Sequence, residues 1–219
     1  SEGYALVDIL VPDAHLWSDK DPFLYDLDIF TGEDHYSLKV GIRTIEVEDG
    51  KILLNGKPVK LNGYGRHEDF FASGKGLNEP LIVKDYQLMR WTGANAYRTS
   101  HYPYSEEEMM MADREGFLVI DEIPAVSLQF DNQENMAERM RMCLQQIDEM
   151  IVRDKNHPSV VMWCVSNEAM PRKIDMATLG QTYDDSDHPE DNAFLDKLLL
   201  YAKEKDATRP VTLVAIMGS

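Results

Sequence analysis

Asn167 and Glu168 are the first candidates for chemistry in this chain, because they end an apolar run over residues 160–165. In a barrel of parallel strands, the carboxyl end of a strand is where reacting groups gather. A carboxylic acid in apolar surroundings keeps its proton more readily and can act as a general acid. An isolated Asn-Glu pair more often caps a turn, so the interpretation depends on the rest of the chain.

Three earlier apolar segments also end in polar groups, which follow at residues 65–69, 98–104 and 121–122. Cleavage of a glycosidic bond suits such a set, because it needs one acid to protonate the leaving oxygen and a second carboxylate as nucleophile or base. Asn167 can hold a sugar hydroxyl. Aromatic faces for the sugar can come from Tyr102, Tyr104 and Trp163. His and Cys residues show no metal-ligand spacing, so we expect neither a metal nor another cofactor.

Alternating strand and helix patterns must position these groups. Strands are predicted at residues 59–64, 94–99, 117–120, 160–165 and 211–215. Amphipathic helices are predicted at residues 81–92, 105–116, 136–151 and 194–202. This alternation implies a parallel sheet with right-handed crossovers, which brings the polar strand ends to one face. The predicted fold class is therefore α/β, a partial (β/α)8 TIM barrel of about five strands.

Residues 1–47 have a different pattern, typical of a half-buried antiparallel sheet. Apolar and polar residues alternate from Phe23 to Ile29, and a turn leads to another strand at residues 37–42. An earlier apolar stretch at residues 6–11 precedes a Pro-Asp turn. These strands are too few to close a sandwich. We predict that residues 1–47 are the C-terminal half of a β-sandwich, and that residues 48–219 are the N-terminal part of the barrel domain.

Composition and charge exclude several classes of protein. Hydrophobic residues make up 43% and charged residues 28% of the 219 residues, as in ordinary globular proteins. The net charge of −17 argues against a nucleic-acid partner, which would need clustered lysine and arginine. No apolar stretch is long enough to span a bilayer, and the first residues lack a signal pattern. We therefore expect no membrane partner and a cytoplasmic location.

The two cysteines and one long acidic segment say little about function. Cys143 and Cys164 lie in apolar segments and are predicted to be small buried residues without a disulfide. The long acidic segment from residue 171 to residue 190 is predicted to be a solvated surface loop. Because this segment follows Glu168, it could also border a substrate site.

Residues 95–104 and 156–168 resemble the two signatures of the family 2 glycoside hydrolases, which include β-galactosidases, β-glucuronidases and β-mannosidases. Residues 16–27 are similar to the immunoglobulin-like domain of that family. Residues 41–45 and 54–57 are similar to the segment that connects this immunoglobulin-like domain to the catalytic barrel in the family. The resemblance implies that residues 1–47 belong to an immunoglobulin-like β-sandwich and that the barrel is the catalytic domain of a retaining glycoside hydrolase.

Within the family, the chain most resembles the β-glucuronidases, through residues 67–69, 74–76, 98–104 and 154–158. That resemblance implies that terminal β-D-glucuronides are the substrates. It implies that Glu168 is the catalytic acid/base and that Asn167 holds the hydroxyl next to the anomeric carbon. Asp69 and His101 are then expected to bind the sugar.

The resemblance also implies supporting residues and some departures. Arg98 and Trp163 are expected to support the sugar-binding groups from behind. Cys164 stands where the family usually has Gly or Ser, and Ala169 where β-glucuronidases usually have Pro. The family's nucleophilic glutamate and its carboxylate-binding Asn-x-Lys element are expected beyond Ser219. The chain by itself is therefore expected to be inactive.

Two alternatives remain at this point. A β-galactosidase of the same family would fit the absence of an obvious cationic clamp for a uronic acid. A non-catalytic carbohydrate-binding or assembly module would fit the missing nucleophile. A partial barrel also exposes strand edges, so we expect self-association into a homo-oligomer.

Overall fold

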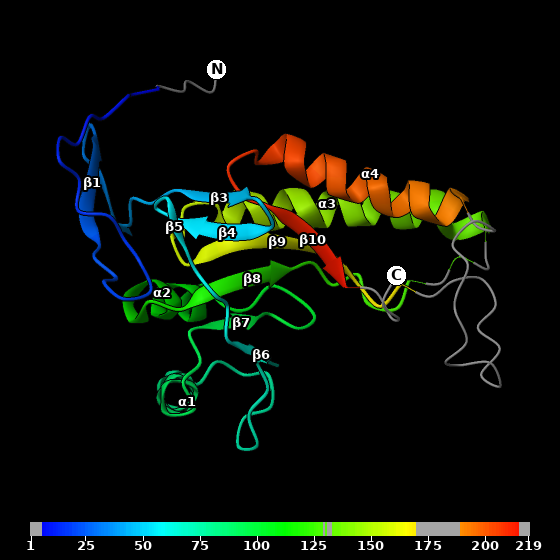
Figure 1. Cartoon of the computed structure of the whole chain (residues 1–219), viewed down its shortest axis with the longest axis horizontal. Coiled ribbons are helices and arrows are strands. Elements are labelled where there is room, and N and C mark those ends of the chain that lie inside the picture. Colours follow the sequence, from blue (N-terminus) through cyan, green and yellow to red (C-terminus); the bar gives the residue numbers. More distant parts are fainter. Residues whose placement is uncertain (1–5, 129, 131–132, 170–188, 215–219) are drawn as a thin grey trace.

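The computed structural model of the chain describes residues 6–128, 130, 133–169 and 189–214, and Figure 1 shows how their elements are arranged. The acidic segment predicted at residues 171–190 lies outside the described residues, except for residues 189–190 at the start of a helix. Ala215, the last residue of the predicted fifth strand, also lies outside them.

Five parallel strands form the central sheet, and each pairs with the next one along the chain. They are β6 (Gly63–Gly65), β7 (Ala96–Arg98), β8 (Leu118–Glu122), β9 (Val160–Asn167) and β10 (Val211–Val214). Successive parallel pairing is how a barrel of strand–helix units is built. The prediction of an α/β partial barrel with about five strands is confirmed.

Helices connect the strands within a few residues of the predicted positions. They are α1 (Glu79–Trp91), α2 (Glu106–Glu115), α3 (Met136–Asp154) and α4 (Pro189–Lys205), with a short 3-10 helix, η1 (Gln133–Asn135), before α3. Local signals set their ends. Ser105 Oγ accepts a hydrogen bond from the Glu108 N–H at the start of α2, and Gly116, with a φ of 74°, ends that helix. None of the described helices is both long and apolar enough to cross a membrane.

The larger hydrophobic cluster fills the space between the helices and the sheet. It includes Ile82 of α1, Met109 of α2 and Leu198 of α4. The predicted apolar stripe of α3 belongs to it as well, with Ile147 and Ile151 buried. Fully burying side chains of this size stabilises the fold by roughly 1.5–3 kcal/mol each. These contacts fix the four helices against the outer face of the strands.

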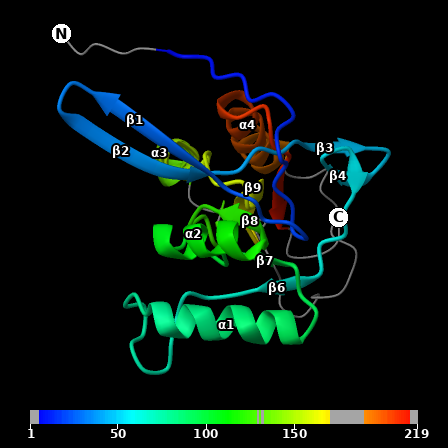
Figure 2. The same ribbon diagram turned by 90° about the vertical axis from the view of Figure 1, so that its left-hand side faces the viewer.

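A three-stranded antiparallel sheet lies beside the parallel strands, on the side away from α2 (Figure 2). Its strands are β3 (Ile45–Glu48), β4 (Lys51–Leu54) and β5 (Lys57–Pro58). Ile45 and Leu54 pack against Ala96, Leu118 and Val161, which lie near the amino ends of β7, β8 and β9. The small sheet therefore closes the amino end of the barrel interior and leaves the carboxyl ends of the strands for chemistry.

The first barrel strand begins later than the sequence predicts. A strand is expected from residue 59, but β6 begins at Gly63. Val59 instead donates its N–H to Ile52 O at 2.9 Å and so extends the small antiparallel sheet. At Gly63 a Cβ atom would collide with the backbone carbonyl of Ala96. Glycine therefore allows β6 to approach β7 closely.

The N-terminal segment contains one antiparallel hairpin, formed by β1 (Tyr25–Thr31) and β2 (Asp34–Val40). The apolar stretch at residues 6–11 is expected to belong to the half-buried antiparallel sheet, but it forms no strand. Leu6 and Leu10 are 89% and 87% exposed, because no described strand lies beside them to pair with. The immunoglobulin-like half-domain over residues 1–47 stays a prediction, and its expected boundary falls within β3.

Trp17 joins this N-terminal segment to the barrel. Its side chain is fully buried, and its Nε1–H donates to Asp113 O at 2.8 Å. Its backbone N–H donates to Ile42 O at 2.8 Å, and its carbonyl accepts from Asn55 Nδ2 at 3.0 Å. Part of the predicted N-terminal domain therefore packs directly on the amino end of the barrel.

Candidate active site

The polar strand ends lie side by side at the carboxyl edge of the parallel sheet. Asn167 ends β9, Glu122 ends β8, and His101 follows β7 by three residues. These three strands are neighbours in the sheet. The expectation that parallel register brings His101, Asn167 and Glu168 to one edge therefore agrees with the topology.

Glu122 joins the groups at this edge into one network. Its carboxylate is fully buried, with Oε1 2.7 Å from His101 Nδ1 and Oε2 accepting from Arg98 Nη1 at 3.0 Å. The same Arg98 nitrogen donates to Asn167 Oδ1 at 3.2 Å. A buried carboxylate needs such partners, because taking a charge out of water costs several kcal/mol. The network orients His101 and Asn167, and in the part of the chain that the structure describes no hydrogen bond occupies His101 Nε2, which leaves this atom for a ligand.

Backbone hydrogen bonds hold Asn167 and Glu168 in place. The Asn167 N–H donates to Ala125 O at 3.0 Å, and the Asn167 carbonyl accepts from the Ser127 N–H at 2.8 Å. The Glu168 N–H donates to Val214 O at 2.8 Å. Between these bonds Glu168 has a φ of 48°, in the left-handed region, and its side chain is exposed. Residues other than glycine pay about 1 kcal/mol or more for this conformation, which persists where neighbouring structure imposes it, often at functional sites.

Asp69 lies on the loop that follows β6, and its side chain is exposed. Among the described residues it makes no hydrogen bond to His101, Glu122 or Asn167. The loop nevertheless reaches the same edge through His67, whose ring lies 5.4 Å from that of His101 in an edge-on arrangement. The structure therefore connects the loop to the network through His67, and the sugar-binding role of Asp69 stays a prediction.

Of the three aromatic side chains expected to contact the sugar, the structure leaves only Tyr102 accessible. Tyr104 is 1% exposed and Trp163 is fully buried, so neither can offer its face to a sugar. Trp163 also does not support the network, because its Nε1–H donates to Asp206 Oδ2 at 2.9 Å on the side that faces α4. Arg98 does support it, as predicted. Tyr102 is half-buried and packs beside His67, with 6.2 Å between the ring centres.

The two acids at the end of β8 face opposite sides of the sheet. Glu122 faces the network, whereas Asp121 Oδ1 accepts from Thr99 Oγ1 at 2.9 Å on the helix side. Burial raises the pKa of Asp121, and the nearby carboxylate of Asp154 raises it further. The sequence pattern places both acids at the end of a strand. It does not predict that Glu122, and not Asp121, contacts His101 and Arg98. The alternation of side chains along a strand is the signal that separates them.

Cys164 lies on β9 opposite Glu122. Both cysteines are free and buried, as predicted. Burial raises the pKa of the Cys164 thiol, and the nearby charge of Glu122 adds to this effect. Cys164 is therefore a neutral packing group beside the network. Within the described ranges, no group of three His, Cys, Asp or Glu side chains could hold a metal ion.

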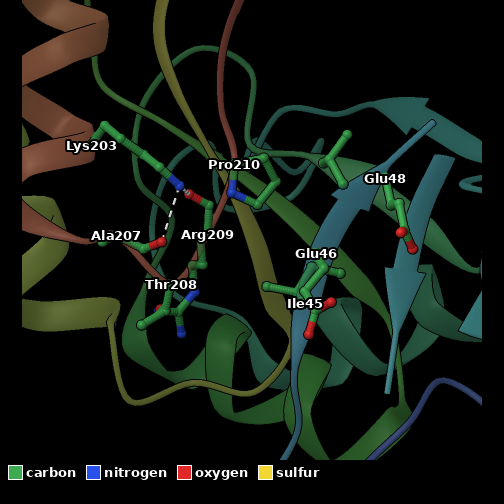
Figure 3. A pocket seen from close by; sticks show the side chains of 9 residues that line it. Ile45, Glu46, Glu48, Lys203, Ala207, Thr208, Arg209 and Pro210 are labelled. Carbon is green, nitrogen blue, oxygen red and sulfur yellow. Dashed lines mark hydrogen bonds between the residues drawn. The ribbon is translucent and has the colours of Figure 1, made fainter. Parts of the chain in front are cut away.

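A cavity of about 480 Å³ lies elsewhere, between β3 and residues 207–210, which precede β10 (Figure 3). It is at the amino end of β10, opposite the end beside Asn167. Lys203 Nζ donates to the carbonyls of Ala207 and Arg209 at 3.0 Å each, and Arg209 Nη1 donates to Asp206 at 2.7 Å. Both cations beside the cavity are thus already bonded, and we do not assign the chemistry to it.

Comparison with protein families explains this arrangement of residues. The chain matches the family model for glycosyl hydrolases family 2, TIM barrel domain, over residues 45–218. The chain belongs to glycosyl hydrolase family 2. Membership confirms the resemblance seen in residues 95–104 and 156–168, and the match covers all five parallel strands of this family 2 chain.

Curated relatives of this family 2 chain include β-glucuronidases from animals and bacteria. Those of Pongo abelii and Homo sapiens are each 41% identical to it over 94% of the chain, and that of Paenibacillus borealis is 39% identical over 93%. The chain spans 31% of the two animal proteins and 34% of the bacterial one. It therefore corresponds to about a third of the length of these relatives.

Solved structures show the same likeness. A β-glucuronidase of an uncultured Clostridium species superposes with a TM-score of 0.81 at 40% identity, covering 94% of this chain and 34% of that one. The Ruminococcus gnavus β-glucuronidase in complex with D-glucuronic acid superposes with a TM-score of 0.76 at 38% identity, covering 92% and 33%. The fold of this family 2 chain is thus the fold of the matching third of those enzymes.

Proposed function

We propose that this chain carries the acid/base half of the active site of a retaining β-glucuronidase, with Glu168 as the acid/base. The observation that carries the proposal is the backbone of Glu168, held in the left-handed region beside the buried Asn167. A strained residue at a strand end in a glycoside hydrolase barrel is best explained by a reacting side chain. The exposed carboxyl group is free to meet a glycosidic oxygen.

Each residue at the carboxyl edge has a role in this mechanism. Glu168 protonates the leaving oxygen and then takes a proton from the water that releases the sugar. Asn167, oriented by Arg98, binds the hydroxyl next to the anomeric carbon. His101, oriented by Glu122, binds a second hydroxyl through Nε2, and Asp69 binds a third from the first loop. Retaining chemistry also needs a nucleophilic carboxylate, and we assign that role to no residue of this chain.

Glucuronides are the proposed substrates because the relatives in several lineages are named β-glucuronidases. One similar solved structure is described as a complex with D-glucuronic acid. Support for a β-galactoside is limited to the sequence argument about a missing cationic clamp. A cytoplasmic location and a homo-oligomeric state stay predictions.

The test is hydrolysis of aryl β-D-glucuronides by the protein encoded by the complete reading frame that contains this chain. Glu168→Gln should lower kcat by about 10²–10⁴-fold on a substrate with a poor leaving group, because general acid catalysis is lost. The loss should be smaller on an activated aryl substrate, whose leaving group needs less protonation. Glu204→Gln, an exposed substitution on α4, is the matched control.

Two results would contradict the proposal. Near wild-type rates for Glu168→Gln on the poor leaving group would show that another residue is the acid. Turnover of aryl β-galactosides without turnover of glucuronides would favour the alternative substrate.

A further inference from the structure

The loop between β6 and α1 carries a cation that the proposed mechanism does not use. Lys75 Nζ lies 4.0 Å from the centre of the Tyr102 ring. Tyr102 packs beside His67, whose ring contacts His101 of the network at the carboxyl edge. The Lys75 ammonium therefore stands at the rim of the candidate site.

Lys75 differs from the other cations near this edge. Arg98 is paired with Glu122 at 3.0 Å, and Arg66 is paired with Glu108 and Asp85. In the part of the chain that the structure describes, Lys75 forms no ion pair with a carboxylate. Its charge is thus not cancelled by a neighbouring acid and is available to an anionic ligand.

The loop holds this cation in a defined position. Phe70 is 6% exposed and anchors the loop in the core. Two backbone hydrogen bonds join Phe70 and Gly74, one from each N–H, at 2.8 and 2.7 Å. Lys75 follows this closed turn directly, and its ammonium rests on an aromatic face, an arrangement that favours a cation. An ammonium positioned in advance loses little freedom when a ligand arrives.

The charge of the chain gives an unpaired cation at this edge a specific role. With a net charge of −17, the chain repels an anionic sugar, and the acids Glu68, Asp69 and Glu168 lie near the same edge. We propose that Lys75 is a specificity-determining residue that favours sugars bearing a carboxylate over neutral sugars. This inference rests on the proposed β-glucuronidase activity and adds a residue that selects the class of substrate.

The test compares Lys75→Met with the wild type in the complete reading frame, on an aryl β-glucuronide and on the neutral β-glucoside with the same aglycone. A rim charge acts mainly on encounter and binding. For the glucuronide, KM should therefore rise about fivefold with kcat little changed, which is the size of an exposed ion pair. The kinetics of any neutral glycoside should not change. Lys75→Arg should keep the preference, because it keeps both the charge and the stacking.

A control variant and a salt series separate the effect of Lys75 from that of a general change in net charge. Lys84→Met, on the exposed face of α1, changes the net charge equally and should leave the preference intact. Raising the ionic strength should weaken glucuronide turnover more in the wild type than in Lys75→Met, because salt screens the field of Lys75.

The failures of the two proposals are distinguishable. An active wild-type enzyme whose KM for the glucuronide is unchanged in Lys75→Met would overturn this inference alone. Equal losses on charged and neutral substrates would also overturn it, because they would show that Lys75 only holds the loop. A wild-type enzyme without glucuronidase activity would overturn the proposed function and this inference with it.

Discussion

At the scale of single residues, the left-handed backbone of Glu168 has a cost that can be measured. Glycine adopts a φ of 48° without strain, and the exposed side chain of Glu168 contributes little packing. Glu168→Gly should therefore raise the free energy of unfolding by about 1 kcal/mol while abolishing the proposed activity. Denaturant unfolding measures this gain. Glu168→Ala, which removes the same carboxyl group and keeps the strain, should show no gain; equal gains in both variants would show that the backbone is not the cause.

The buried carboxylate of Glu122 leads to the opposite expectation. Glu122→Gln leaves Arg98 without its counter-charge in a buried setting and should lower the free energy of unfolding by about 3 kcal/mol. Urea unfolding followed by circular dichroism measures the change. Glu138→Gln breaks the exposed pair with Arg141 and should change nothing measurable. A Glu122→Gln variant as stable as this control would show that the network does not support the fold.

The sequence predicts much of the site at this scale, but not its centre. His101, Asn167 and Glu168 follow strands whose apolar runs are easily seen, so topology alone brings them to one edge. Glu122 is harder, because it adjoins Asp121 and only one of the two can face inward. The inward face of β8 includes Leu118, which packs inside the barrel, and the period of two then selects Glu122. Without a known inner residue, the sequence leaves the choice open.

At the scale of elements, Asp113 connects α2, β9 and the N-terminal segment. Its Oδ2 lies 2.6 Å from His157 Nδ1, its Oδ1 accepts from the Ser159 N–H at 3.0 Å, and its backbone carbonyl accepts from Trp17. Burial lowers the pKa of His157, but the hydrogen bond and charge of Asp113 outweigh burial and raise it above its usual value. The protonated imidazole therefore stabilises the contact between these elements.

This contact predicts a dependence of stability on pH. A histidine whose pKa is higher in the folded protein contributes fully below its unfolded value of about 6.5, and the contribution is lost as pH rises through the folded value. The free energy of unfolding should thus fall as pH rises through that window. His157→Asn should remove this part of the fall, and so should Asp113→Asn. An unchanged pH profile in both variants would contradict the assignment.

The elements themselves are well predicted where local signals agree with packing. The ends of α2 follow from Ser105 and Gly116, and the stripe of α3 follows from its period. Residues 6–11 form no strand although their pattern fits one, and the reason is different. Their apolar residues fit a strand, but strands form only when a partner lies beside them, and partners far away in sequence are not visible in a local pattern.

At the scale of the whole molecule, both outer strands of the sheet have an unpaired edge within the described residues. The residues of β6 are exposed and those of β10 are half-buried. Open edges of this kind pair with other chains. We expect the 219-residue chain to self-associate at micromolar concentration in sedimentation experiments.

Net charge determines how that association responds to salt. A charge of −17 makes copies repel each other, and about 0.15 M salt shortens the range of this repulsion to about 8 Å. Association should therefore increase with added NaCl. A single sharp monomeric species at low and high salt, with a cooperative melt, would show that the edges are protected.

The order of strands in the sheet also bears on how the chain is made. Each barrel strand after β6 pairs with the barrel strand that precedes it, and α4 packs on both β9 and β10, the two strands that it connects. Translation adds about 5–20 residues per second from the N-terminus. The strand with which each new barrel strand pairs has therefore already been synthesised when the new strand emerges from the ribosome. Such a chain can assemble in the direction of synthesis, one strand and helix at a time, without waiting for a distant partner.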